Sequence, residues 1–506
     1  MTMEQLFEIG VLAALAFPGL RAASSSAYRR VFPFDSLRIG IVSALYLAAV
    51  AAVASYAPGA LRPLSVPAAA AVGYLLWRSR PGYGTAAGLP PGSLQPLPVR
   101  PWSDPEFYAK TARRHGEIFK MSQFGQPMVC VLGLERANRL LLEHDHLLVA
   151  PPLPFNRFIE GGYLRYLPED THAHYRRIFR ALFHSGVMTS AEPRIAAVFR
   201  NALQAMAEES TRAGKVAVRT AFMRMMFAAW AELFYGIDAA HPDFARLKQL
   251  FRIIDSRKAR WSSRRRVGPA LAEIETILKT RAKTLVPAQA ARADTLGTDV
   301  TPPSCFLAAL ARSDPAALSD RTILGNLIYI MQITWGDVTG LLLWVFKMLS
   351  DHPEWRERLA REPSRDLATR IVLETLRLEQ SESRYRRAVA DLELDGFRIP
   401  KGWLVRMCIR ESHRDEKVFP DPLVFDPERF CGRAFTRGEY APFGAFRLAC
   451  IGEDVTKAVA GSFALELACG FDWEVVEDGP ARISSWVHNA PHPRLSVTMK
   501  PRARAA

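Results

Sequence analysis

Cysteine is scarce in this 506-residue sequence, and its six residues form no recognisable pattern. None belongs to a Cys-x-x-Cys pair, which argues against a zinc ribbon and against a disulfide framework. The positions are Cys130, Cys305, Cys408, Cys431, Cys450 and Cys469. A reducing compartment is the simplest setting for such a chain.

The sequence also lacks a concentrated block of one charge. It holds 66 Lys and Arg residues against 51 Asp and Glu residues, a net charge of +15, and the basic residues are dispersed. No zinc finger, RNA-binding strand motif or basic zipper accompanies them, so we expect no nucleic-acid partner. With 49% hydrophobic residues, the composition excludes disordered and collagen-like chains and suits one large globular domain or two smaller ones.

Uncharged hydrophobic runs occur near the N-terminus. Residues 39–57 contain no charge and are long enough to cross roughly 30 Å of hydrocarbon as a helix. A shorter apolar run at 64–77 suits an interfacial or tilted second segment. A cleaved signal peptide is disfavoured because no small-residue cleavage site follows an N-terminal basic region, whereas a buried soluble hairpin stays open. We therefore predict a membrane-anchor region over residues 1–81.

Basic residues around these runs predict the orientation. Four arginines precede the first run, and only Arg62 separates the two runs. The four are Arg21, Arg29, Arg30 and Arg38. If both runs cross, the excess of positive charge places the N-terminus and the C-terminal domain on the cytoplasmic side.

Proline and glycine dominate residues 82–102, which we predict to be a non-helical linker. The remaining residues, 103–506, form the predicted catalytic domain. Helical periodicity prevails at 190–380, strand-like segments return at 386–409, and a last helix is expected over about 451–469. The predicted fold class is mainly α with small β-sheets, an α+β architecture.

A loop near the C-terminus contains a cysteine in an unusual setting. Cys450 lies at the start of the last predicted helix, behind a glycine-containing loop with Phe443 seven residues earlier. The positive end of a helix favours a thiolate, which could ligate iron. The alternative interpretation of a lone cysteine is a small buried hydrophobic residue.

Three charged residues upstream form a motif only when their order in the sequence is considered together. Glu374 and Arg377 lie three residues apart on one predicted helix face, where they can form a bidentate pair. Such a spacing alone is uninformative, but Arg429 follows in Phe-Asp-Pro-Glu-Arg-Phe, and Cys450 comes 21 residues after it.

With these motifs the chain resembles the cytochromes P450, the haem-thiolate oxygenases. The resemblance runs from the Leu-Pro-Pro-Gly at 89–92 to about residue 499 and includes Ser-His-Arg-Asp at 412–415. It implies the P450 fold, a bound haem b and Cys450 as the proximal iron ligand. It also implies that Glu374, Arg377 and Arg429 form a buried network that stabilises the fold.

The resemblance further implies a set of residues around the cofactor. His172 and Arg176 match the helix that holds the haem propionates, although an ordinary solvated basic helix would show the same residues. Arg386 matches a second propionate-binding position, with Arg387 as the alternative. Phe443 and Arg447 of the cysteine loop are also expected to contact the cofactor.

Two parts of the chain depart from the family pattern. Phe446 and Leu448 stand where the family usually has glycine and arginine, so the loop is expected to be reshaped, with Arg447 supplying the missing charge. On the helix expected over the distal haem face, Asp337 takes the place of the usual alcohol. Asp337 and, if the helix is distorted, Thr339 are the candidate catalytic residues for proton transfer. A helix-face Asp paired elsewhere is the alternative.

These features favour a monooxygenase that oxidises a lipophilic small molecule with O2 and electrons from a separate ferredoxin or flavoprotein reductase. A peroxide-using, dehydratase or isomerase member of the family is the first alternative, and a catalytically silent haem-binding protein is the second. The stretch at 251–266 holds seven basic residues and Trp261, which is typical of contact with anionic membrane lipid or of a solvated basic face.

Overall fold

The computed structural model describes residues 87–94, 104, 106–123, 126–151, 162–254, 264–296, 302–380, 384–483 and 489–502. The predicted membrane segments 39–57 and 64–77 lie outside these residues. The chain forms two compact units. Unit 1 comprises Met1–Pro154, Ser383–Ser412 and Ile483–His488, and unit 2 comprises Phe155–Glu382, His413–Arg482 and Asn489–Ala506.

Unit 1 contains a six-stranded mixed sheet and short helices. Its helices are α6 (Phe107–His115), α7 (Leu134–His144) and α17 (Ile409–Ser412), with the 3-10 turn η2 (Asp145–Leu147). Its strands are β1 (Gly92–Ser93), β2 (Ile118–Gln123), β3 (Gln126–Val131), β4 (Leu148–Val149), β6 (Arg384–Ala388), β7 (Leu392–Leu394), β8 (Phe397–Ile399) and β9 (Leu404–Met407). The order in the large sheet is β1-β2-β3-β9-β6-β4, and β7 and β8 form a hairpin.

Alternating apolar residues explain the sheet of unit 1. Phe119 and Met121 of β2 and Met128 and Cys130 of β3 are buried in one hydrophobic cluster with Tyr385 of β6. Side chains two residues apart on a strand share a face, so this spacing covers one face of the sheet with apolar groups.

The first strand lies inside the predicted linker. β1 pairs in parallel with β2, and the amide of Lys120 donates to the Pro91 carbonyl at 2.7 Å. Gly92 has φ of +115°, and a Cβ there would lie 2.2 Å from the Lys120 carbonyl oxygen. Only glycine fits this close approach, so the folded sheet begins within residues 82–102 rather than after them.

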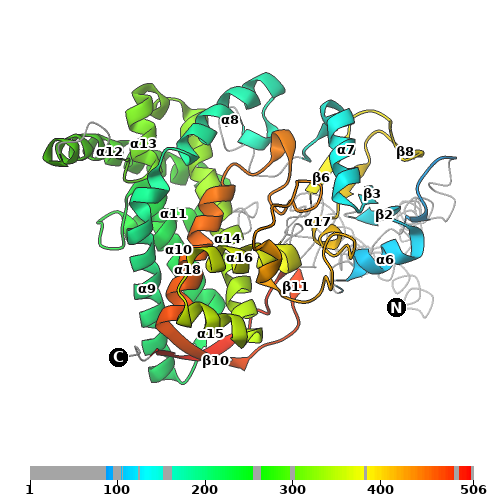
Figure 1. Ribbon diagram of the computed structural model, residues 1–506. Helices are drawn as coiled ribbons and strands as arrows, with labels where there is room; N and C mark the ends of the chain where they lie inside the picture. Colours follow the sequence, from blue (N-terminus) through cyan, green and yellow to red (C-terminus); the bar gives the residue numbers. More distant parts are fainter. Residues whose placement is uncertain are drawn as a thin grey trace, which may run out of the picture. The chain divides into compact units, whose positions relative to one another are not determined.

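Unit 2 is mostly helical (Figure 1). Its helices are α8 (Glu169–Phe183), α9 (Val187–Ala213), α10 (Val218–Tyr235), α11 (Phe244–Ile254), α12 (Arg264–Leu296), α13 (Phe306–Ser313), α14 (Arg321–Asp351), α15 (Pro353–Arg361), α16 (Arg365–Thr375) and α18 (Glu453–Gly470). Short turns are η4 (Leu164–Tyr166), η6 (Pro315–Leu318), the π-turn η7 (Leu376–Gln380), η8 (Pro427–Phe430) and η9 (Phe446–Leu448). Strands β5 (Val216–Ala217), β10 (Phe471–Glu477) and β13 (Ser496–Pro501) form one sheet, and β11 (Arg482–Ile483) pairs with β12 (Asn489–Ala490).

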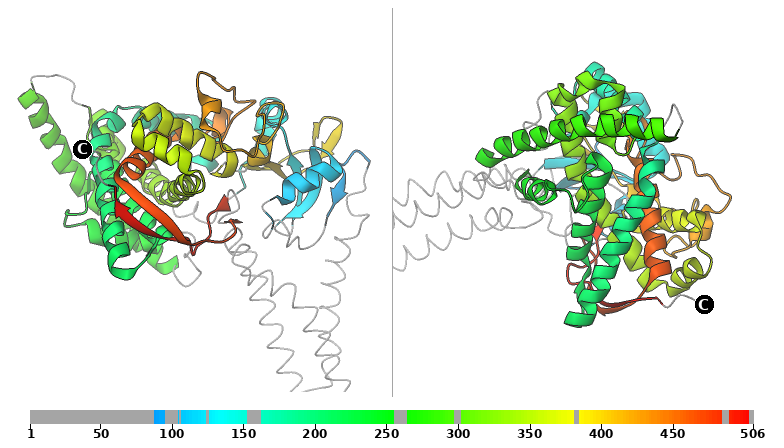
Figure 2. Two further views of the ribbon diagram at one scale, coloured as in Figure 1. Left: turned by 60° about the horizontal axis from the view of Figure 1, so that its bottom comes forward. Right: turned by 90° about the vertical axis from the view of Figure 1, so that its left-hand side faces the viewer.

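Helix α14 is the central helix of unit 2. The Asp320 side chain caps its start by accepting from the amides of Thr322 at 2.7 Å and Ile323 at 3.2 Å. The helix packs against α10 and α18, which in turn pack against α9 (Figure 2). Among the described residues it is the one helix long and apolar enough to cross a membrane, but most of it is buried within the protein, as expected of a core helix.

The predicted fold class is confirmed. Helices prevail between residues 190 and 380, the strands β6 to β9 fall within the expected segment 386–409 or just before it, and α18 occupies the place of the last predicted helix.

Candidate functional site

Cys450 lies on a tightly bonded loop of unit 2 that leads into α18. The Cys450 amide donates to the Phe443 carbonyl at 2.9 Å, and the Ala449 amide donates to the Phe446 carbonyl at 3.0 Å. These bonds turn the chain so that the Cys450 side chain is exposed within a cavity rather than packed in the core. Helix α18 begins three residues later, and its positive end favours negative charge on a sulfur placed there.

Phe446 adopts a left-handed backbone conformation in the cysteine loop. Its φ is +60°, close to the +76° of Gly444 two residues before it. A non-glycine residue in this region costs about 1–2 kcal/mol. The Phe446 side chain is 42% exposed, so the bulky residue is accommodated by pointing to solvent. The loop therefore has a left-handed residue at the position where the family usually has glycine, and its reshaping relative to the family stays a prediction.

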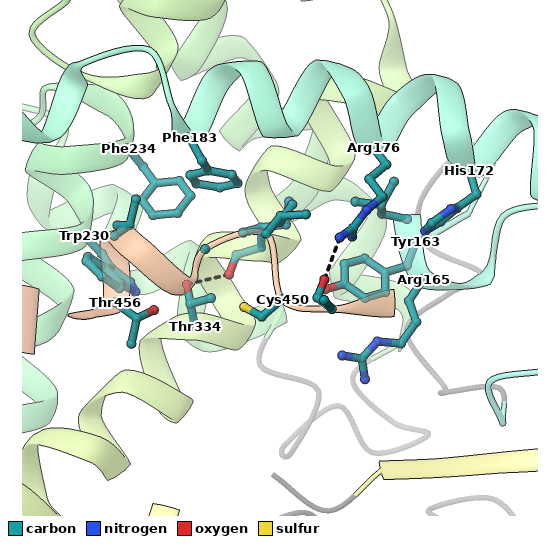
Figure 3. Close-up of a pocket in the computed structure, with 16 residues that line it drawn as sticks. Tyr163, Arg165, His172, Arg176, Phe183, Trp230, Phe234, Thr334, Cys450 and Thr456 are labelled. Atoms are coloured by element: carbon teal, nitrogen blue, oxygen red, sulfur yellow. Dashed lines mark hydrogen bonds between the residues drawn. The ribbon is translucent and has the colours of Figure 1, made fainter. Parts of the chain in front are cut away.

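The cavity at Cys450 has a basic end and an aromatic end (Figure 3). Its basic residues are Arg165 of η4 and His172 and Arg176 of α8. Its aromatic end holds Phe183, Trp230 and Phe234, whereas Tyr163 lies beside the basic residues. Helix α14 contributes Ile330 and Thr334, and the cysteine loop and α18 contribute residues 449–452, Val455 and Thr456.

Arg176 is fixed beside the cysteine loop. Its guanidinium donates to the Ala449 carbonyl at 2.9 Å, as Figure 3 shows. Burial, followed by the charge of Arg180, lowers the pKa of Arg176, whereas Cys450 acts in the opposite direction and Arg447 lowers the pKa further. Arg176 therefore lies within electrostatic reach of the Cys450 sulfur and of Arg447. His172 is 2% exposed and lines the same cavity.

The other residues predicted to contact a cofactor lie as follows. Phe443 is partly buried and holds Cys450 through its carbonyl. Arg447 is partly buried in η9. Arg386 is buried on β6, where its guanidinium donates to the Tyr385 carbonyl at 2.8 Å. Arg386 belongs to unit 1 and Cys450 to unit 2, so its role at the cofactor stays a prediction.

The structure brings Glu374, Arg377 and Arg429 together. Arg377 and Glu374 are both fully buried and form a bidentate pair with N–O distances of 2.7 and 2.8 Å. Arg429 lies 3.4 Å from a Glu374 oxygen, and its guanidinium also donates to the carbonyls of Pro420 and Asp421. Arg377 donates further to the carbonyls of His413, Pro422 and Val424.

This network holds the chain between α16 and the cysteine loop. The carbonyls that it binds are part of an irregular segment, and a buried carbonyl without a partner would be costly. Glu374 also accepts from the Asp426 amide at 3.0 Å. The π-turn η7 contains Arg377 and ends α16 directly beside this network. We infer that the network stabilises the loop and takes no part in the chemistry.

His413 extends this network and should make stability depend on pH. Burial, followed by the charge of Arg377, lowers the pKa of His413 to about 3. Its Nε2 accepts from the Ala441 amide at 3.0 Å, which requires the neutral ring. In the unfolded chain the ring has a pKa of about 6.5.

Between about pH 6.5 and pH 3, His413 is therefore protonated in the unfolded chain but neutral in the folded protein. We expect His413 to remove up to about 1.4 kcal/mol of stability per pH unit across this window, with no effect above it. Urea unfolding of His413→Gln at several pH values should show a shallower acid loss than wild type. The exposed His184, changed to Gln, should keep the wild-type slope; equal slopes in all three proteins would contradict the prediction.

Helix α14 exposes a short window in its middle. Ile333, Thr334 and Gly336 are partly exposed and Asp337 is exposed, whereas the flanking turns are buried. Asp337 lies about 60° around the helix from Thr334 and about 20° from Ile330, both of which line the Cys450 cavity. Helical geometry therefore directs Asp337 toward the same side as these two residues.

The structure does not bring Thr339 to this window. Thr339 lies about 140° around the helix from Thr334 and is 2% exposed. Its hydroxyl donates to the Trp335 carbonyl at 2.6 Å, and α14 continues as an α-helix through this turn. Thr339 would face the cavity only if the helix were locally distorted, and α14 is a regular α-helix over Arg321–Asp351.

Sequence reasoning missed the residues that complete the cavity. Phe183, Trp230 and Phe234 come from two helices, and no linear spacing connects them with Cys450. Arg165 stands alone in a turn without a motif. Thr334 could have been found by following the helix one turn back from Asp337, because both share a face.

Comparison with known proteins decides the family. The model of the family described as Cytochrome P450 matches residues 99–493, which is most of the chain. The chain belongs to the cytochrome P450 family. This P450 is therefore an oxidoreductase of the monooxygenase type, and members of its family bind haem through a cysteine thiolate.

Several relatives of this P450 are known. It is 26% identical to abscisic acid 8'-hydroxylase 3 of Oryza sativa subsp. indica over 439 residues, which cover 78% of this chain and 84% of the relative. It is also 26% identical to the putative cytochrome P450 120 of Synechocystis sp. over 454 residues, which cover 81% of this chain and 98% of the relative. Among solved structures, this P450 is similar to retinoic acid bound cyanobacterial CYP120A1, with a TM-score of 0.65 and 22% sequence identity. The match covers 83% of this chain and 100% of that chain.

The residues of the cavity fit a haem. The site offers one exposed thiol, a buried histidine and two arginines at one end, and apolar rings at the other. A haem needs an axial ligand, partners for two carboxylates and an apolar surface for its ring, and the cavity supplies each of these groups.

Proposed function

We propose that Cys450 is the axial thiolate of a haem b and that the cavity around it is the active site of a monooxygenase. The observation that carries this proposal is the exposed Cys450 sulfur in a cavity that also contains His172 and Arg176. His172, Arg176 and Arg165 would hold the propionates, and the family motif adds Arg447 and Arg386 as predicted partners. Bound haem supplies the oxygen-activating chemistry, which a thiolate ligand promotes.

We further propose a lipophilic small-molecule substrate and a separate ferredoxin or flavoprotein reductase as electron donor. Relatives named for hydroxylation of abscisic acid, and a structural neighbour that binds retinoic acid, support an apolar substrate of moderate size. The aromatic end of the cavity agrees with such a ligand class.

Asp337 is the residue that we propose to handle protons at this site. Its carboxylate lies in the exposed window of α14, on the face that Ile330 and Thr334 present to the cavity. A carboxylate can accept a proton from solvent at one oxygen and donate it toward the substrate side. We place Thr339, the second candidate, behind Asp337 because it lies about 140° around α14 from Thr334 and is 2% exposed.

One assay tests both the reaction and Asp337. We expect product formation from a lipophilic substrate panel to require O2, reduced nicotinamide and an added redox partner. In Asp337→Asn we expect at least about tenfold less product, with more peroxide released per nicotinamide consumed. Asp337→Glu should restore part of the activity, and Thr339→Val should stay within about twofold of wild type.

The same assay separates the alternative function. The family pattern has an acid directly before the usual alcohol, and this chain has Gly336 at that position. This difference favours a member that uses peroxide or rearranges its substrate without external electrons. Product formed with peroxide alone, or with neither oxidant nor reductant, would replace the monooxygenase proposal. No product under any of these conditions would support a silent haem-binding protein.

We propose that the chain is anchored by residues 1–81 with its catalytic domain on the cytoplasmic side, and that basic side chains add a second contact with lipid. Burial, followed by the charges of Arg252 and Arg224, lowers the pKa of Lys248, so these three cations lie close together on α10 and α11. Anionic headgroups would relieve their repulsion. After proteolytic removal of residues 1–80, the domain should still float with anionic liposomes, and loss of flotation would exclude this second contact.

A further inference from the structure

Trp230 of α10 contains a buried donor without a partner. The side chain is 2% exposed, and its Nε1 makes no hydrogen bond with any residue that the structure describes. Two other buried tryptophans are satisfied: Trp335 donates to the Met223 carbonyl and Trp473 to the Ser350 hydroxyl, both at 2.8 Å. Buried polar groups nearly always have a partner, so the indole of Trp230 indicates an acceptor other than the described residues.

The indole lies at one end of the Cys450 cavity. Figure 3 shows its nitrogen edge directed toward Thr456, with Thr334 at the same end. The Thr334 hydroxyl donates to the Ile330 carbonyl at 2.7 Å, which leaves its oxygen able to accept. In the described part of the chain the Thr456 hydroxyl makes no bond, so it can donate or accept.

The proposed haem does not supply the missing acceptor. Its carboxylates are the acceptors that it carries, and their proposed partners are His172 and Arg176. Figure 3 places both of these residues at the opposite end of the cavity from Trp230 and Thr456. The acceptor must therefore be a separate small molecule.

We propose that one internal water is bound by the Trp230 indole and by the hydroxyls of Thr334 and Thr456. The water accepts from Trp230, donates to Thr334 and exchanges its remaining bond with Thr456. Three polar partners match the usual number for a buried water. This inference rests on the proposed function for the position of the haem only.

The proposed water joins three helices at the site. Trp230 comes from α10, Thr334 from α14 and Thr456 from the second turn of α18. Because α18 begins directly after the cysteine loop, the water fixes the start of that helix, and with it Cys450, relative to α14. Trp230 is thus a positioning residue and takes no part in the reaction itself.

Nuclear magnetic resonance of the full chain tests the site directly. The haem-loaded protein is labelled with 15N-tryptophan and studied in detergent in its reduced, carbon-monoxide-bound form, which is diamagnetic. Trp230→Phe identifies the indole signal. We expect a cross-relaxation peak between this indole proton and water in the wild type. The peak should be lost in Thr456→Val, weakened in Thr334→Val and retained in Thr456→Ser and in the matched control Thr339→Val.

A Trp230 indole without a water peak in the wild type would overturn the proposal, as would a peak that persists unchanged in both Thr334→Val and Thr456→Val. The carbon monoxide spectrum of the same samples reports the iron ligand independently. A protein with an unshifted band but an intact water peak would contradict the proposed function and not this inference.

Discussion

Replacing Cys450 by alanine is expected to abolish the strongly red-shifted absorption band of the reduced protein with carbon monoxide, together with all product formation. The shifted band depends on thiolate ligation, and Cys450 is the cysteine that lines the cavity with His172 and Arg176. The measurement is the difference spectrum of purified wild-type and Cys450→Ala protein, each at equal haem content. We expect no shifted band in the variant, whatever haem remains bound.

A matched control comes from the other exposed cysteine. Cys431 is also exposed, but it lies after η8 and does not line the cavity. Cys431→Ala should therefore keep the wild-type spectrum. A shifted band in Cys450→Ala, or an unshifted band in the wild type, would refute thiolate ligation by Cys450. The alternative functions would then be favoured over the monooxygenase.

Removing one partner of the Glu374–Arg377 pair should strongly destabilise the protein. Arg377→Met leaves a fully buried carboxylate without its bidentate partner and strands three backbone carbonyls. A broken buried pair typically costs about 3–5 kcal/mol. We expect a large drop in the urea midpoint, measured by circular dichroism, and little soluble haem-loaded protein.

Two comparisons isolate the effect of burial. Arg246 and Glu273 form a bidentate pair with similar distances of 2.5 and 2.6 Å, but both side chains are largely exposed. Arg246→Met should leave the midpoint close to that of wild type because water solvates the remaining carboxylate. The double variant Glu374→Met/Arg377→Met should lose less than the sum of its single variants. A wild-type midpoint in Arg377→Met would contradict the proposed structural role.

The parts of the site that the sequence predicts are those in which one residue type is required at a fixed spacing. Glu374 and Arg377 must lie one helical turn apart to pair, and Cys450 must precede a helix to benefit from its positive end. Such constraints remain visible in a single sequence. The structure places Glu374 beside Arg377 and Arg429, and the cysteine loop leads into α18.

The distal helix shows where this reasoning fails. Matching residues by position directed attention to Asp337 and Thr339, but the direction of a side chain depends on the helical phase relative to the cavity. Thr334 and Ile330 define that phase, and Thr339 lies about 140° around the helix from Thr334. The aromatic end of the cavity was equally hidden, because Phe183 and Trp230 become neighbours only through the packing of α8 against other helices.

The bond between Pro91 and Lys120 also decides where the chain can be shortened. Because Gly92 and Ser93 complete the edge of the six-stranded sheet, and the Lys120 side chain donates to the Pro90 carbonyl at 2.5 Å, this proline segment contributes to folding as well as to spacing. The Arg398 amide also donates to the Gly88 carbonyl at 2.6 Å. A shortened form designed for crystallisation should therefore begin before Gly88. Removal of all residues before the predicted domain start, residue 103, would leave the amide of Lys120 unpaired and expose an edge strand to aggregation.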